Sequence, residues 1–253
     1  MDNNITLYCK SPECRDKVEQ LAQRFLLPIS EVPTDSKIQL VITETHITVT
    51  APNLGNPIWI DFTQGKNAHR RQFGGGRGQA LAKAIGLKKG ATPTVIDATA
   101  GYGRDAYVLS TLGCQVTLIE RNPILAILLE DAIDRAQGDS ETEDIANRMQ
   151  LVHHSSINYF AQLSSDHYPD VIYIDPMYPS RQKTALVKKE MQLLHQLIGP
   201  DTDSSELLVT ARAIAQKRVV IKRPTSAAPI DQQKPNAAIE SKSTRYDIYI
   251  KGL

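Results

Sequence analysis

The chain has 253 residues, of which 41% are hydrophobic, and its 29 basic and 28 acidic residues leave a formal net charge of +1. This length and apolar content predict a folded globular protein with one large domain and a small appendage, and they exclude a disordered or fibrous chain. No apolar run is long enough to cross a bilayer and no apolar segment follows Met1, so we expect a soluble cytoplasmic protein with no membrane partner.

Residues 1–62 predict a small α+β domain. A helix is expected from Pro12, at its first turn, to Phe25, because apolar side chains recur there on one face. Alternating β-rich runs predict strands at residues 4–9, 38–43, 46–51 and 57–62. The chain has three cysteines; the spacing of Cys9 and Cys14 is poor for zinc, so we expect reduced thiols and no metal site.

Residues 63–90 predict a basic, glycine-rich linker followed by a short helix at 79–85. No acidic residue lies between Asp61 and Asp97, whereas seven basic residues do. Such a segment can fold over a bound polyanion, with guanidinium groups as phosphate donors, and a plain interdomain linker is the alternative. The arginines expected to contact RNA are Arg70, Arg71 and Arg77.

The stretch TVIDATAGYGRDA at residues 94–106 predicts a strand, a tight turn and a helix start. Gly101 and Gly103 let backbone amides approach a ligand, and the helix N-terminus favours negative charge. The turn formally matches the G-x-G-x-x-A fingerprint of dinucleotide-binding proteins. However, Asp97 ends the strand four residues before Gly101, an offset that resembles the first motif of class I S-adenosylmethionine (SAM)-dependent methyltransferases.

Two further strand ends carry polar side chains. Glu120 ends a predicted strand at 115–120, where an acid accepts hydrogen bonds from a ribose diol. Ser155 and Ser156 follow a predicted strand at 149–153, at the sheet edge where parallel α/β folds bind ligands. One of the two serines could equally cap the helix that follows.

The segment DVIYIDPMYP at residues 170–179 predicts a buried strand that ends in a catalytic tip. It matches, with one change, the Asp/Asn-Pro-Pro-Tyr motif of methyltransferases that act on exocyclic amino groups; Met177 replaces the second proline. A nucleobase amine is a poor nucleophile until its hydrogens are held by acceptors. Asp175 and the Pro176 carbonyl can be those acceptors, and Tyr178 can stack on the base.

The remaining segments complete the predicted sheet. We expect a helix at 204–215 and strands at 218–222, 237–240 and 246–250. Residues 91–253 then form an α/β domain with a seven-stranded, mostly parallel sheet. Basic residues that follow the catalytic tip are expected to contact RNA phosphates, namely Lys183, Lys188 and Lys189.

The chain as a whole resembles the bacterial small-subunit ribosomal RNA methyltransferase J family. The segments that carry the resemblance are HRRQFGGGRG, DATAGYGRDA, LIERNP, DPMYP with ALVKKEM, RVVIKRP and RYDIY. The resemblance implies a Rossmann-like class I fold, SAM as the methyl donor and N2 of guanosine 1516 in 16S ribosomal RNA, or in the 30S subunit, as the acceptor. It also implies cofactor contacts at Arg104, Asp105, Glu120, Arg121, Ser155, Ser156 and Asp175.

Two other functions remain open at this point. An NAD-dependent oxidoreductase fits the formal fingerprint and Glu120, but it leaves the Asp-Pro-Met-Tyr tip and the basic tracts unexplained. A noncatalytic RNA-binding assembly factor fits the basic tracts but has no need of acids at the strand ends. The oligomeric state does not follow from the sequence.

Overall fold

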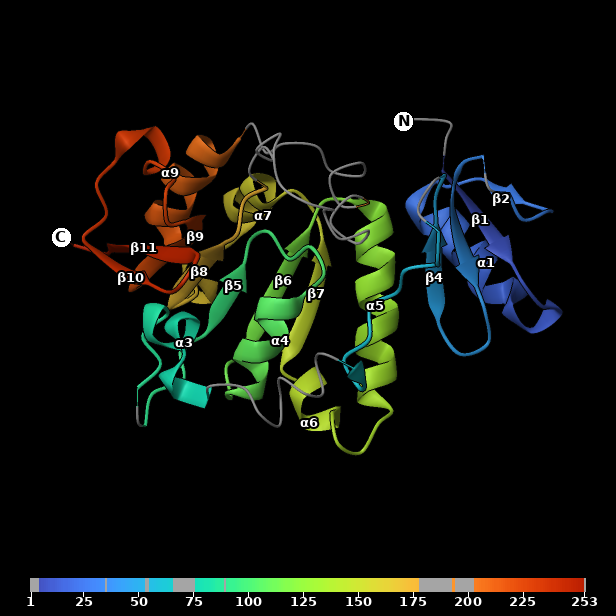
Figure 1. Cartoon of the computed structure of the whole chain (residues 1–253), viewed down its shortest axis with the longest axis horizontal. Helices are drawn as coiled ribbons and strands as arrows, with labels where there is room; N and C mark the ends of the chain where they lie inside the picture. The colour runs from blue at the N-terminus through green and yellow to red at the C-terminus, as the bar shows by residue number, and fades with distance from the viewer. Residues whose placement is uncertain are drawn as a thin grey trace.

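The computed structural model describes residues 5–34, 36–52, 55–65, 76–88, 90–177, 193 and 203–252. Its strands form two sheets (Figure 1). A four-stranded sheet, in the order β2-β1-β3-β4, belongs to the N-terminal residues, and a seven-stranded sheet, in the order β10-β11-β9-β8-β5-β6-β7, belongs to the rest. Helix α5 (Pro123–Gln137) lies between the two sheets.

The N-terminal sheet contains three of the four predicted strands and one strand that was not predicted, at Ile29–Ser30. Its elements are β1 (Ile5–Cys9), the 3-10 turn η1 (Pro12–Cys14), α1 (Arg15–Phe25), β2 (Ile29–Ser30), β3 (Ile38–Ile42) and β4 (Ile47–Thr50). The strand predicted at 57–62 is wrong, because only an isolated bridge joins Ile58 to Val49. The alternation in this segment reflects burial instead: Ile58, Ile60 and Phe62 point into the core, while Trp59 is 48% exposed.

The large sheet has a parallel centre and an antiparallel edge. Its strands are β5 (Val95–Asp97), β6 (Val116–Glu120), β7 (Met149–His153), β8 (Val171–Ile174), β9 (Arg218–Pro224), β10 (Ala237–Glu240) and β11 (Thr244–Ile250). Strands β5 to β9 pair in parallel, and β11 runs antiparallel to β9 and β10. From β5 the chain adds β6 and β7 on one side of the sheet, and it then returns to add β8 on the other side. The position between β5 and β8 is therefore a topological switch point, and ligands bind at such a point beyond the carboxyl ends of the strands. The seven-stranded, mostly parallel sheet predicted from the sequence is confirmed.

Helices cover both faces of the large sheet. They are α3 (Ala80–Ala84), α4 (Arg104–Thr111), α5, α6 (Glu143–Ala146), α7 (Ser156–Gln162) and α9 (Ser204–Ile214), with 3-10 turns η2 (Gly76–Gly78), η3 (Ser165–His167) and η4 (Ile230–Gln232). One apolar core packs α7 and α9 against one face, and the other packs α4, α5 and the N-terminal sheet against the opposite face. Successive strand residues alternate between these cores, as the pleat of a sheet requires. In the part of the chain that is described, no helix is long and apolar enough to cross a membrane.

A buried carboxylate fixes the N-terminal sheet to α5. Asp131 is 3% exposed, and it accepts hydrogen bonds from the Lys17 ammonium at 2.9 Å, the Ile47 amide at 3.0 Å and the Arg135 guanidinium at 3.0 Å. These donors come from α1, β4 and α5. Phe62 adds an apolar contact by stacking on Tyr107 with ring centroids 4.8 Å apart. The residues before and after position 62 share one apolar core. The domain boundary after residue 62 therefore stays a prediction.

Candidate active site

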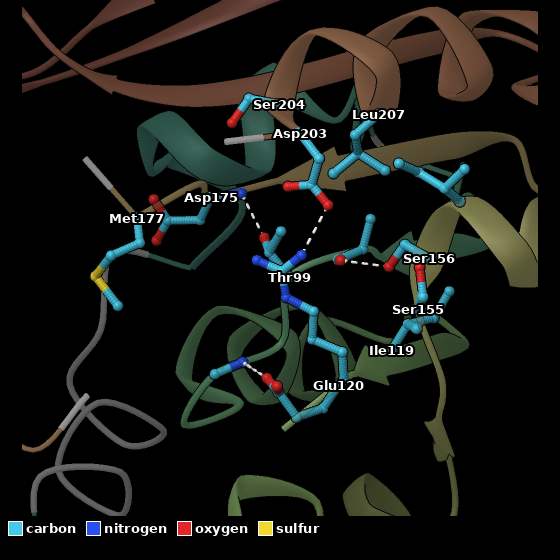
Figure 2. Close-up of a pocket in the computed structure, with 14 residues that line it drawn as sticks. Thr99, Ile119, Glu120, Ser155, Ser156, Asp175, Met177, Asp203, Ser204 and Leu207 are labelled. Atoms are coloured by element: carbon cyan, nitrogen blue, oxygen red, sulfur yellow. Dashed lines mark hydrogen bonds and ion pairs between the residues drawn. The ribbon is translucent and has the colours of Figure 1, made fainter. Parts of the chain in front are cut away.

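A pocket lies at the carboxyl ends of β5, β6 and β8, at the switch point of the sheet (Figure 2). Its empty volume is about 640 Å³, including space open to solvent. Its walls are Ala98, Thr99, Gly101, Ile119, Glu120, Arg121, Ser155, Ser156, Ile157, Asp175, Met177, Asp203, Ser204 and Leu207. In Figure 2, Asp175 and Met177 lie at one end of the pocket and Ser155 and Ser156 at the other.

The two glycines of the β5–α4 turn do different things. Gly101 lines the pocket with φ +55°, and a Cβ there would come no closer than 3.9 Å to the Thr99 carbonyl oxygen, so the pocket side of the turn is open. Gly103 has φ +66°, and a Cβ would approach Leu129 Cδ2 to 2.7 Å and Phe62 Cζ to 3.1 Å. The second glycine therefore permits close packing at the back of the turn and does not line the pocket.

Glu120 joins the two turns that border the pocket. Its carboxylate is 4% exposed and accepts hydrogen bonds from the Gly101 amide at 2.9 Å and the Asn122 amide at 2.7 Å. The Asn122 side chain in turn caps α5 by accepting from the Ile124 and Leu125 amides. A carboxylate held by two amides is fixed in place, which suits an acceptor for ligand hydroxyl groups.

An ion pair crosses the pocket. The Arg121 guanidinium, just after β6, lies 2.7 Å from the Asp203 carboxylate, just before α9. Both residues line the pocket. Asp203 was missed by sequence reasoning, because its place at the pocket depends on the docking of α9 on the sheet, which no local pattern reports.

The two serines after β7 also line the pocket, but neither caps α7 through its side chain. Ser155 occupies the N-cap position without a side-chain cap hydrogen bond. The Ser156 hydroxyl donates to the Ala98 carbonyl at 2.6 Å and so ties the start of α7 to the β5–α4 turn. The capping alternative for this pair is therefore not realised.

Asp175 is held at the tip of β8 by two contacts. Its amide donates to the Thr99 hydroxyl at 2.7 Å, and its Oδ2 accepts from the Lys222 ammonium at 2.8 Å. The same ammonium donates to Asp105 Oδ2 at 2.8 Å, which also accepts from the Tyr173 hydroxyl at 2.7 Å. Lys222 thus joins the first turn of α4 to the tip of β8.

Sequence reasoning missed Lys222 and Tyr173. A usable signal existed, because Lys222 directly follows the buried apolar run Val219, Val220 and Ile221 of β9. Strands β8 and β9 pair in parallel with Ile174 opposite Ile221, so the next residue of each strand, Asp175 and Lys222, must be neighbours. That register could not be read from the sequence without knowing that the two strands are adjacent.

Burial and neighbouring charges set the protonation of this group. Burial raises the pKa of the Asp97 carboxyl to about 8, helped by Asp105 and Asp175 and opposed by the Thr99 amide and by Lys222. Burial lowers the pKa of Lys222, but the Asp175 and Asp105 carboxylates outweigh it and raise the pKa above its usual value. At neutral pH the cluster therefore holds a neutral Asp97 beside a protonated Lys222.

Several predicted residues lie away from the pocket or outside the described part. The Arg104 guanidinium lies over the Tyr102 ring, 5.2 Å from its centroid. Arg77 donates to the carbonyls of Lys88 and Leu112, beyond the end of α4 that is remote from the pocket. Pro176 directly follows Asp175 in the described chain. The predicted residues that lie outside the described ranges are Arg70, Arg71, Tyr178, Lys183, Lys188 and Lys189.

The described side chains contain no cluster of three or more His, Cys, Asp or Glu residues able to hold a metal ion. The three cysteines are free thiols: Cys14 and Cys114 are buried, and Cys9 is half-buried.

Comparison with known proteins agrees with this fold. The sequence model of the family described as "Putative SAM-dependent methyltransferase" matches residues 20–251. The crystal structure of a SAM-dependent methyltransferase from Neisseria gonorrhoeae superimposes with a TM-score of 0.78 and 33% identity, over 98% of this chain and 96% of that one. The protein is thus a SAM-dependent methyltransferase, with a Rossmann-like fold and SAM as its cofactor.

Curated relatives narrow the family. Ribosomal RNA small subunit methyltransferase J from Vibrio campbellii is 47% identical over 257 residues, covering 98% of both chains. The protein of the same name from Shewanella amazonensis is 56% identical over 201 residues, covering 79% of this chain and 80% of its own. The chain belongs to the ribosomal RNA small subunit methyltransferase J family. The NAD-dependent oxidoreductase and the noncatalytic factor considered from the sequence are therefore wrong.

Proposed function

We propose that the enzyme transfers the methyl group of SAM to the exocyclic N2 amine of guanosine 1516 in 16S ribosomal RNA. The observation that carries the proposal is Asp175, a carboxylate that lines the pocket at a strand tip and is followed by Pro176. The names of the relatives support a ribosomal RNA substrate. Because ribosomal subunits are assembled in the bacterial cytoplasm, we place the activity there.

The pocket fits the cofactor by the chemistry of its walls. Glu120 presents a fixed carboxylate to the ribose hydroxyl groups, and Gly101 leaves the room that a side chain would fill. Arg121, Ser155 and Ser156 line the same space and supply polar contacts to the rest of the nucleoside. The proposed cofactor contacts that do not line the pocket are Asp97, Gly103, Arg104 and Asp105.

Asp175 and Pro176, at the tip of β8, prepare the N2 amine for reaction. When bound, SAM supplies an electrophilic methyl group on its sulfonium. Asp175 and the Pro176 carbonyl accept hydrogen bonds from the N2 hydrogens, which frees the nitrogen lone pair from conjugation with the ring. Methyl transfer to N2 would leave the nitrogen positive, and Asp175 or solvent would accept its proton.

Two further sets of residues complete the proposal. Tyr178 stacks on the extruded guanine and fixes its orientation. The basic residues that hold the RNA phosphates are Arg70, Arg71, Arg77, Lys183, Lys188 and Lys189.

The decisive experiment measures transfer of tritiated methyl groups from SAM to unmethylated 30S subunits and to free 16S RNA. We expect one methyl group per subunit at N2 of a guanosine, mapped by nuclease digestion and mass spectrometry. Asp175→Ala should abolish the transfer while SAM binding, measured by calorimetry, weakens much less. Wild-type turnover without methylated guanosine, or full turnover by Asp175→Ala, would refute the proposal.

A further inference from the structure

A network of charged and hydrogen-bonded side chains extends from the first turn of α4 to the catalytic tip. It runs from Tyr173 to Asp105, from Asp105 to Lys222 and from Lys222 to Asp175, through three contacts of 2.7 to 2.8 Å. The members come from β8, α4 and β9, so the network spans segments far apart in the sequence. The network is partly buried, since the Asp105, Lys222 and Asp175 side chains are 12%, 29% and 38% exposed.

The position of Lys222 limits what it can do. Two of the three hydrogens of its ammonium are directed to Asp105 and Asp175. Contact with an RNA phosphate would compete with both carboxylates, which hold the ammonium from two sides. The two carboxylates raise the pKa of Lys222 despite burial. The side chain therefore stays an ammonium cation that keeps its proton and is not available as a base.

Asp175 needs such a fixed cation. A carboxyl group at the end of a strand can rotate about its Cα–Cβ and Cβ–Cγ bonds, and each rotation moves the oxygen atoms out of line with an incoming amine. The Thr99 hydroxyl holds the backbone of Asp175, and the Lys222 ammonium holds its Oδ2. Together they fix both the place of the residue and the rotation of its carboxyl group, as a preorganised site requires.

We propose that Lys222 is a positioning residue for methyl transfer, whose ammonium bridges Asp105 and Asp175 and thereby fixes the catalytic carboxylate in line with the target amine. This inference rests on the proposed function of Asp175. It also gives Asp105 a role beyond the proposed cofactor contact. Through Lys222, Asp105 links the first turn of α4 to Asp175, the carboxylate proposed to bind the target amine. Tyr173 supports the bridge from inside the sheet, since its hydroxyl donates to the same oxygen of Asp105.

The test compares Lys222→Met and Lys222→Arg with a matched control, Lys217→Met. Lys217 lies just before the same strand and also pairs with a carboxylate, Asp170, at 2.9 Å, but at the opposite end of the sheet. For each variant, kcat and the KM for 30S subunits are measured with tritiated SAM, SAM binding is measured by calorimetry, and folding is checked by thermal melting. Lys222→Ala is also assayed with added ethylammonium, which can replace the missing ammonium group.

We expect Lys222→Met to lower kcat about 100-fold, the loss typical of a misaligned catalytic group, while the KM for 30S subunits changes by less than about threefold. Lys222→Arg should recover to within about tenfold of wild type, and ethylammonium should raise the kcat of Lys222→Ala. Lys217→Met should match wild type. If Lys222→Met does not fold, Lys222→Ala decides: a lowered kcat with unchanged KM, raised by ethylammonium, supports the bridge.

Two results would overturn the inference. One is wild-type kcat in a folded Lys222→Met or, where that variant does not fold, in Lys222→Ala without ethylammonium; the other is a loss confined to the KM for 30S subunits, which marks a phosphate contact. Failure of the proposed function gives a different result, because the wild-type enzyme itself would then form no methylated guanosine.

Discussion

The two amide contacts of Glu120 allow a quantitative test of the cofactor site. In Glu120→Gln, one carboxylate oxygen becomes an NH2 group, which faces either the Gly101 amide or the Asn122 amide, donor against donor. Each hydrogen bond to a charged acceptor is worth about 1.5–3 kcal/mol, and a ribose hydroxyl would lose its ionised partner at the same time. Losing one such contact to the ligand and distorting the turn should weaken SAM binding by about 2.7 kcal/mol, or about 100-fold in Kd.

Calorimetric titration with SAM measures this directly, with S-adenosylhomocysteine as a second ligand. Both ligands should lose affinity by the same factor, because they share the ribose and differ only at sulfur. Glu141→Gln is a suitable control, since it makes the same change in the exposed segment that follows α5. A change of less than about threefold in Glu120→Gln would refute the ribose assignment. A loss for SAM alone would place the carboxylate near the sulfonium instead.

Three further outcomes are expected. Asp131→Ala should lower the free energy of unfolding by about 1–3 kcal/mol in urea titrations, because it leaves the buried Ile47 amide without its acceptor. Glu130→Ala, at an exposed pair on the same helix, should cost less than about 1 kcal/mol, and equal losses would contradict the buried anchor. Folded Asp97 keeps a proton that the unfolded chain releases near pH 3.8. The free energy of unfolding should therefore fall as pH rises from about 4 to 8, by at most about 1.4 kcal/mol per pH unit. Asp97→Asn should flatten this slope, and an unchanged slope would mean that another group titrates. Asp203→Asn should weaken SAM binding by at most about fivefold, and less at high salt, because its half-exposed ion pair with Arg121 only orients the guanidinium; a loss above about 50-fold would mean that Asp203 binds the cofactor itself.

The strands of the large sheet and several polar residues of its pocket follow from local patterns in the sequence. Gly101, Glu120, Ser155, Ser156 and Asp175 each end or follow an apolar run, and in a parallel α/β sheet all such ends meet at one edge. Periodicity alone therefore brings these residues together, without knowledge of any long-range contact.

The parts that could not be predicted depend on packing between distant segments. Lys222 becomes part of the site only because β9 lies beside β8, and Asp203 only because α9 packs against α7 and β9. Gly103 looked like a ligand-binding glycine because the motif allows it, whereas its missing Cβ makes room for Leu129 and Phe62. The segment at 57–62 alternates like a strand because its alternate side chains enter a core, although it pairs through one bridge only.

The contact between Phe62 and the cofactor turn changes how deletion experiments on this family should be interpreted. A shortened chain that begins after Phe62 loses the ring stacked on Tyr107 and exposes the back of Gly103. It would lose methylation through collapse of the cofactor turn, whether or not the N-terminal sheet ever touches RNA. Substitution of an exposed side chain such as Trp59, which lies against His46 at 5.6 Å between ring centroids, leaves that packing intact and isolates recognition from folding.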